Sequence, residues 1–118
     1  MITEDYVSFE TALLLKKKGF EQIGCQKQYN TQGDLCTGYC YGPVAPTLQM
    51  AMKWLRKVHN KNITLDMISL NEDCYVLWTF NIYYNKNYKI IWGTKQPKYN
   101  TYEEAAEAAI KYCLENLI

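Results

Sequence analysis

The sequence predicts an α+β fold in which three helices pack on one face of a small antiparallel sheet, a three-stranded meander, with an extra N-terminal hairpin or ordered loop. Two observations carry this prediction. Apolar residues recur with helical spacing in three segments, and they alternate with polar residues between the second and third of these segments. At 118 residues the chain has the size of one domain that buries its own core without disulfides or metals. We therefore expect residues 1–118 to form a single globular domain.

The first helix is expected at residues 9–18 because both of its ends carry sequence signals. Ser8 is placed to act as the N-cap, and Gly19 followed by Phe20 matches a Schellman stop. The lysine run at residues 16–18 lies in the last turn, where the helix macrodipole favours cations. We interpret this run as a helix end and not as a phosphate site. The residues expected on the apolar face are Phe9, Ala12 and Leu13.

Residues 24–43 contain few aliphatic side chains and many Tyr, Cys, Gln, Gly and Thr residues. Turn-forming residues at 30–33 lie between two short strand-capable flanks, which predicts a small hairpin or an ordered loop. Because this segment has little to bury, it should be the least regular part of the fold. Irregular surface segments often hold binding residues, so we expect it to contribute to any binding surface.

The segment APTLQMAMKWLRKVH, residues 45–59, is predicted to be an amphipathic core helix with Thr47 as its N-cap. Met50 and Trp54 lie on the flank of its apolar face, where they edge the core or rim a pocket. His59 stands at the negative end of the helix, which favours the imidazolium if the ring is in water. Since no Ser, Asp or Glu lies at catalytic spacing, we interpret it as a structural or surface histidine. The apolar face contains Leu48, Ala51, Met52, Leu55, Val58 and His59.

After this helix the apolar period changes from 3.6 to 2, which predicts antiparallel strands at residues 63–70, 74–84 and 88–94. One face of the central strand is apolar, with Val76, Trp78, Phe80 and Ile82. The other face carries Tyr75, Thr79, Asn81 and Tyr83. The meander should therefore have one side under the helices and one tyrosine-bearing side.

A last helix should begin at Thr101, because Thr101 and Glu104 have the spacing of a capping box. It should run nearly to the end of the chain. Its stripe is rich in alanine, which allows a close approach of the helix backbone to the sheet. The stripe consists of Ala106, Ala109, Ile110, Cys113, Leu114 and Leu117.

Charge and hydropathy exclude several classes of partner. Thirteen Lys and Arg residues against twelve Asp and Glu residues give a formal net charge of +1, so no global field draws the chain to nucleic acid or to an anionic membrane. The longest apolar run is far shorter than the ~20 residues of a membrane-spanning helix. The first five residues lack the basic start of a signal peptide. We expect a cytoplasmic protein with no membrane partner and no long nucleic acid partner.

The cysteines are expected to be reduced structural thiols, because they are odd in number and the chain shows no export signal. Cys36 and Cys40 form one loose pair, whereas a zinc site needs two pairs with suitable spacing. We therefore expect no metal and no cofactor. The five cysteines are Cys25, Cys36, Cys40, Cys74 and Cys113.

Three stretches taken together, SFETALLLKKKGF, APTLQMAMKWLRKVHN and YEEAAEAAIKYCLENLI, cover about two fifths of the residues. They resemble small uncharacterised proteins encoded by phages and prophages of gut Bacteroidetes, and the middle helix is the most specific part of the resemblance. The resemblance implies a one-domain layout and an origin in an infected or lysogenic bacterial host. It implies no catalytic residue.

Tyrosine is abundant, with eleven residues, and suits both exposed sheet faces and interface cores. The first functional hypothesis is therefore a non-enzymatic accessory binding protein of phage or prophage type that contacts a host or phage protein through a tyrosine-rich surface. A homo-oligomer also stays open. The residues expected to bind a ligand or partner are Tyr39, Tyr41, Trp54, Arg56, Tyr75, Tyr83, Trp92 and Lys98.

The second hypothesis is a sponge that sequesters a small nucleotide signal of host defence. It requires aromatic stacking faces and cations near phosphates. The Walker and dinucleotide-binding glycine patterns are absent, so side chains would have to hold the nucleotide. The candidates are Trp54, Arg56, Trp92 and Lys98.

A third hypothesis is an enzyme with Cys36 or Cys40 as nucleophile and His59 as base. Nothing in their spacing requires these groups to meet, and one cysteine with one histidine is a weak signal. We therefore expect no enzyme and no catalytic residue.

Overall fold

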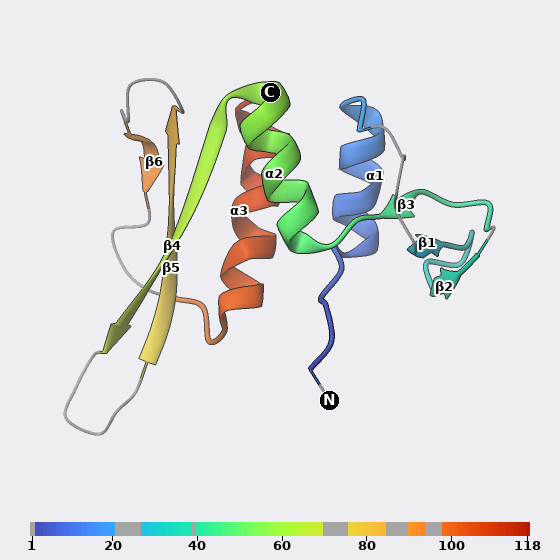
Figure 1. Ribbon diagram of the computed structural model, residues 1–118, viewed down its shortest axis with the longest axis horizontal. Helices are drawn as coiled ribbons and strands as arrows, with labels where there is room; N and C mark the ends of the chain where they lie inside the picture. The colour runs from blue at the N-terminus through green and yellow to red at the C-terminus, as the bar shows by residue number, and fades with distance from the viewer. Residues whose placement is uncertain (1, 21–26, 39, 70–75, 85–89, 94–97) are drawn as a thin grey trace.

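The computed structural model describes residues 2–20, 27–38, 40–69, 76–84, 90–93 and 98–118, and of residues 91–93 it describes the backbone alone. The α+β prediction is confirmed, with three helices and two small antiparallel sheets (Figure 1). In chain order the elements are α1 (Phe9–Lys17), β1 (Lys27–Tyr29), β2 (Leu35–Thr37), β3 (Val44–Ala45), α2 (Leu48–His59), β4 (Lys61–Ser69), β5 (Val76–Tyr84), β6 (Ile90–Gly93) and α3 (Tyr102–Asn116).

All three helices begin at the residues that the sequence predicts. The side-chain oxygens of Ser8, Thr47 and Thr101 each accept a hydrogen bond from a backbone N–H three residues later. Glu104 also stabilises the start of α3. Its Oε2 accepts from the backbone N–H of Asn100, one residue before the N-cap, at 3.1 Å. Local capping signals therefore fix the three helix starts.

The ends of α1 and α2 use left-handed residues. Gly19 has a φ of 92°, and the N–H of Phe20 donates to the carbonyl of Leu15 at 2.9 Å, as in a Schellman stop. The end of α2 depends on Asn60, whose φ of 58° places it in the left-handed region. This turn leads directly into β4.

The larger sheet has the strand order β4-β5-β6, and both of its strand pairs are antiparallel. The pairs Ile63–Ile82 and Leu65–Phe80 bring apolar side chains together on one face. The helices α2 and α3 contact this sheet, whereas the main contacts of α1 are with α3 and β3 (Figure 1). The expectation that all three helices cover the sheet is therefore wrong for α1, which forms a further layer beyond α3.

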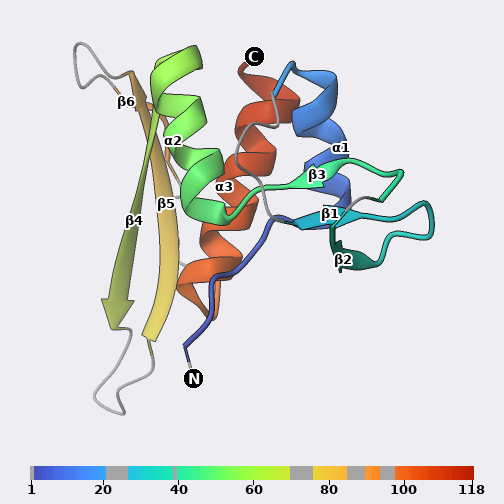
Figure 2. The same cartoon turned by 45° about the vertical axis from the view of Figure 1, so that its right-hand side comes forward.

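The smaller sheet has the order β2-β1-β3 and lies on the far side of α1 from the larger sheet (Figure 2). Tyr29, at the end of β1, attaches it to the helices. The Tyr29 hydroxyl donates to the carbonyl of Val7 at 2.6 Å, and the Tyr29 ring meets the Phe9 ring edge to face at 5.4 Å. Burial raises the pKa of Tyr29, with the Glu107 charge as a second cause. The tyrosine therefore acts here as a neutral donor within the core.

The three helices are parallel to one another. Near the start of α1, Thr11 donates its hydroxyl proton to Glu107 of α3, and just beyond the end of α1, Lys18 donates to the carbonyl of Ile118 at the end of the chain. Gln49 in the first turn of α2 donates to the Tyr102 hydroxyl at the start of α3. All three N-terminal ends therefore lie on the same side of the molecule (Figure 1).

The core matches the predicted apolar stripes at most positions. Leu55, Phe80 and Ile82 are at most 2% exposed, and α3 buries its predicted stripe through Leu114. Two predictions are wrong: Val58 is 60% exposed and Leu13 is 44% exposed. Each lies on an arc of its helix that no neighbouring element covers, and in α1 the buried arc is shifted to Thr11, Ala12 and Leu15.

Several expectations concern residues outside the description. Residues 70, 74–75, 88–89 and 94 of the expected strands fall there, as do Cys25 and Cys74. Within the described residues, no helix combines the length and the apolar character needed to cross a membrane.

The contrast between Leu55 and Val58 gives a stability prediction within one helix. Leu55→Ala removes a fully buried side chain and should lower the free energy of unfolding by about 2–5 kcal/mol. Val58→Ala removes an exposed side chain and should change it by less than about 0.5 kcal/mol. Urea unfolding followed by circular dichroism measures both values, and equal losses would contradict the exposed position of Val58.

Candidate functional site

Two adjoining hollows lie at the side of the molecule where the three helices begin. The larger has a volume of about 580 Å³ and the smaller about 270 Å³. They share Asp5, Leu48 and Glu103, so we treat them as one surface and call it the N-terminal groove. It is lined by Ile2, Thr3, Glu4, Asp5, Tyr6, Ser8, Leu48, Gln49, Tyr99, Tyr102, Glu103, Glu104, Glu107 and Ala108.

One wall of the groove is the segment before α1, which backbone hydrogen bonds tie to the start of α2. The N–H of Leu48 donates to the carbonyl of Asp5 at 3.0 Å, and the N–H of Val7 donates to the carbonyl of Pro46 at 3.1 Å. Tyr6 and Thr47 form an antiparallel bridge between these two bonds. This wall is therefore positioned by the fold although it belongs to neither a helix nor a sheet.

The opposite wall is the first half of α3 together with Tyr99. The backbone of Tyr99 pairs with Trp78 of β5, where the two N–H···O distances are 2.7 and 3.1 Å. The Tyr99 ring lies 6.0 Å from the Phe80 ring, and the Trp78 ring meets the Tyr102 ring edge to face at 5.4 Å. The aromatic part of the groove is thus continuous with the core of the larger sheet.

The groove combines an aromatic and apolar lining with a negative field. Its lining includes the apolar surfaces of Tyr6, Leu48, Tyr99 and Ala108. It contains no lysine or arginine, whereas five of the twelve acidic residues of the chain belong to it. The ion pairs of the described residues join Lys111 to Glu10 and Glu115, outside the groove, and the charge of Lys111 also acts on Glu107. Such a surface attracts cations.

The five carboxylates differ in whether their oxygens accept hydrogen bonds within the fold. Glu104 caps α3, and Oε1 of Glu107 accepts from the Ser8 N–H at 3.1 Å and from the Thr11 hydroxyl at 2.6 Å. Glu4, Asp5 and Glu103 are exposed. The exposed carboxylates therefore supply the field that a ligand would meet.

The groove does not gather its carboxylates into a metal site. Among the described residues, no group of three or more His, Cys, Asp or Glu side chains lies close enough to hold a metal ion. Carboxylates spread along a groove suit an extended cationic group better than a single ion.

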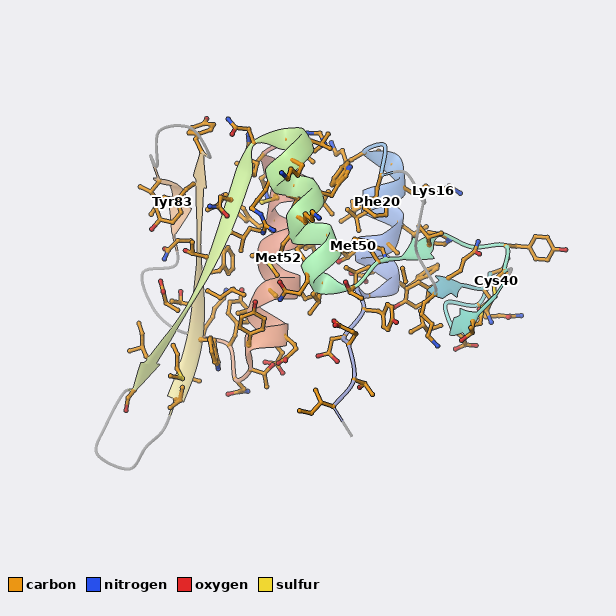
Figure 3. All side chains as sticks on the ribbon, in the orientation of Figure 1. Lys16, Phe20, Cys40, Met50, Met52 and Tyr83 are labelled. Atoms are coloured by element: carbon orange, nitrogen blue, oxygen red, sulfur yellow. A yellow bond between two sulfur atoms is a disulfide. The ribbon has the colours of Figure 1, made fainter. Side chains whose placement is uncertain are left out.

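The candidate residues chosen from the sequence do not form one surface. Tyr41 is 81% exposed beside the smaller sheet, whereas Tyr83 belongs to β5. Figure 3 shows Tyr83 and Cys40, the neighbour of Tyr41, at opposite ends of a molecule whose longest extent is 47 Å. Tyr39 and Tyr75 lie outside the described residues.

The four residues suggested for a nucleotide are also dispersed. The Trp54 ring meets the rings of Phe20 and His59 edge to face at 5.4 and 4.6 Å, so it belongs to the edge of the core. Arg56 is half-buried on the same helix. Lys98 lies over the Tyr99 ring at 5.4 Å, beside the acidic groove. The fourth residue, Trp92, lies on β6, and its side chain is not described.

The cysteine and histidine candidates are separated as well. The sulfur atoms of Cys36, in β2, and of Cys40 lie next to each other, and the Cys36 sulfur also lies 3.2 Å from the carbonyl oxygen of Gln28. His59 instead packs on Trp54 at the end of α2. Cys113 is free and buried, and burial raises the pKa of its thiol to about 12. No described contact joins a cysteine to His59.

The sequence interpretation missed the groove. Its acidic residues form two clusters, at positions 4–5 and 103–107, and each cluster precedes or opens a predicted helix. The two clusters can be recognised in the sequence. They indicate a single site, however, only when the parallel arrangement of α1 and α3 is known. Comparison with protein-family models, with curated proteins and with solved structures found no significant match to this chain.

Glu107 gives the first prediction for the site, because it lines the groove and also ties α1 to α3. Glu107→Ala leaves the Thr11 hydroxyl and the Ser8 N–H without their acceptor and should lower the free energy of unfolding by about 1–3 kcal/mol. Glu103→Gln, at an exposed position, should cost less than about 1 kcal/mol. A double-mutant cycle with Thr11→Val measures the link, and additive losses would contradict it.

His59 gives the second prediction. Burial lowers its pKa below the ordinary value of 6.5, and the charges of Lys61 and Lys18 lower it further, in contrast to the imidazolium that the helix end favours in water. Folding therefore favours the neutral ring. The contribution of neutral His59 to the free energy of unfolding is complete above pH 6.5 and is lost as the pH falls through the lower pKa of the folded state. His59 is the only histidine, so its Hε1 resonance in an NMR titration reports this pKa without assignment. Lys61→Gln should raise the pKa, and a wild-type value at or above 6.5 would contradict the packing.

Proposed function

We propose that this chain is a non-enzymatic binding module whose N-terminal groove holds a segment of a partner protein that carries an apolar side chain flanked by lysine or arginine. The observation that carries the proposal is the composition of the groove, in which aromatic and apolar side chains stand beside five carboxylates and no basic residue. An apolar anchor between two basic groups matches this arrangement in both polarity and charge.

A peptide fits the groove better than the other ligand classes that the sequence left open. A phosphate would meet uncompensated carboxylates, which disfavours the nucleotide sponge at this site. The two hollows adjoin through Asp5, Leu48 and Glu103, so an extended chain can occupy both. The elongated shape therefore favours a chain segment.

The lining supports binding without catalysis. It contains no histidine, cysteine or lysine, and its one serine serves the fold. The Ser8 hydroxyl donates to the Thr11 hydroxyl and its oxygen accepts from the Thr11 N–H. The one serine is thus engaged at the start of α1, and the lining has no histidine to activate it.

The proposal keeps the hypothesis of a tyrosine-bearing surface, but the tyrosines of the groove are not those chosen from the sequence. Tyr6, Tyr99 and Tyr102 line the groove and are each half-buried. Their rings offer apolar area at low entropic cost, and their hydroxyls can donate to a partner backbone. A phage or prophage origin, a cytoplasmic location and a host or phage protein as the partner belong to this proposal.

The binding test uses two blocked pentapeptides and two-dimensional NMR of the isotope-labelled protein. The probe has a central leucine flanked by two arginines and two lysines, and its control has glutamates in place of the four basic residues. The probe should shift the amide signals of Tyr6, Leu48 and Ala108 with an affinity weaker than about 10 µM, and the control should not. Raising the salt concentration from about 50 mM to 500 mM should weaken the probe's binding.

Matched variants locate the site. Asp5→Asn and Glu103→Gln remove exposed carboxylates that both hollows share, and each should weaken probe binding about two- to fivefold. Glu115→Gln removes a carboxylate outside the groove and should leave binding unchanged. Equal shifts with both peptides would refute the proposal. A thermal shift with a cyclic or linear nucleotide, with none from the basic probe, would favour the nucleotide sponge instead.

A further inference from the structure

One edge of β4 pairs with no strand among the residues that the structure describes. Its nine residues pair with β5 along their full length, from Lys61 opposite Tyr84 to Ser69 opposite Val76. The far edge of β5 is covered by β6 and by the bridge between Trp78 and Tyr99. In the part of the chain that the structure describes, no strand or bridge pairs with the other edge of β4. Alternate backbone N–H and C=O groups along about 30 Å of strand therefore face outward.

This edge lacks the usual features that protect a strand from pairing. Proteins block such edges with proline, with a bulge or with charged side chains that point inward. β4 contains no proline, and its register with β5 runs without a shift. Its charges are Lys61 at the first position and Asp66, which accepts from Asn81 across the sheet. The middle of the edge is thus free to accept another strand.

We propose that β4 pairs in antiparallel fashion with β4 of a second copy of this chain, which gives a symmetric dimer with one continuous six-stranded sheet. The two-fold axis passes beside Leu65. The numbers of two residues that lie opposite each other in the two copies therefore add up to 130. Ile63 then faces Met67, and Leu65 faces itself, so the apolar face of one sheet continues into the next.

The charges of β4 do not oppose one another in this register. Lys61 lies opposite Ser69 of the second copy, and Asp66 lies opposite Thr64, so no like charges meet. A second copy of β4 therefore fits this edge without like-charge repulsion.

The exposure of two apolar side chains supports the same arrangement. Met67 belongs to the face that the helices cover, yet it is 61% exposed, and Ile68 on the opposite face is 40% exposed. Figure 1 shows the reason: this end of the β4–β5 hairpin extends beyond the helices. In the dimer, Met67 lies beside Ile63 of the second copy, which is 7% exposed and near the helices of that copy.

Sedimentation equilibrium of the full chain over a range of concentrations tests the dimer. The wild-type mass should rise with concentration from 13.8 kDa towards twice that value. Thr64→Asp places a carboxylate opposite Asp66 of the second copy at two symmetric positions and should raise the dissociation constant on the order of tenfold. Thr64→Lys places an ammonium there and should lower it. The pair of changes Thr64→Asp and Asp66→Lys should recover wild-type dimerisation.

Circular dichroism of each variant checks that it is folded, so that loss of the dimer is not mistaken for loss of the fold. Glu103→Lys, in the groove, should leave the dissociation constant unchanged, and monomeric Thr64→Asp should still bind the basic pentapeptide. A wild-type protein that is monomeric up to about 0.5 mM would overturn the proposal. A dimer that responds equally to Thr64→Asp and Thr64→Lys would place the interface elsewhere and would overturn it as well.

Discussion

The burial of α3 from two sides is the constraint on which the rest of the structure depends. This helix contacts β4 and β5 on one side and α1 on another. Its alanines at 105, 106 and 109 are fully buried, so the helix backbone approaches its neighbours closely. Where α1 meets α3 the contact is polar, and Glu107 receives both the Thr11 hydroxyl and the Ser8 N–H. Together with the Lys111–Glu10 ion pair and the bond from Lys18 to the Ile118 carbonyl, this carboxylate fixes the axial position of α1 against α3.

The parallel arrangement of the helices separates charge within a nearly neutral chain. Their C-terminal ends carry the lysines at 16–18, the Arg56–Lys57 pair and the lysine that follows at 61, whereas the acidic residues at 4–5 and 103–107 lie at the N-terminal ends. The basic residues in the last turns of α1 and α2 and the acidic residues in the first turn of α3 also oppose the partial charge of the helix end beside them, which is favourable. A net charge of +1 therefore argues against binding to long polyanions and says nothing about the local field over one surface. The acidic groove is a consequence of topology.

Whether a feature could be predicted depends on how far apart in the sequence the residues that produce it lie. The cap at Thr101 and the alternation around Phe80 are local, because each depends on residues a few positions apart, and both are readable in the sequence. The exposure of Val58 and Leu13 is not readable, because a helical wheel shows which residues share a face and not how wide an arc the neighbours cover. The groove was the least predictable feature, since it joins three chain segments that only long-range contacts bring together, such as the backbone bond between Leu48 and Asp5 and the bonds to Glu107.

The groove's carboxylates differ in how much of their placement the fold alone explains. Glu103 and Glu104 stand in the first turn of α3, where they oppose the helix dipole, and Glu107 has its task between the helices. Asp5 has no such explanation. It precedes the N-cap of α1 by three residues, its carbonyl is held by the first N–H of α2, and its side chain stays exposed. A backbone bond thus fixes the main chain at Asp5, whose exposed carboxylate forms no described ion pair. A charge that the fold does not itself use remains available when an opposite charge arrives. This is the physical reason to regard the groove as a binding surface and not as a gap left by helix packing.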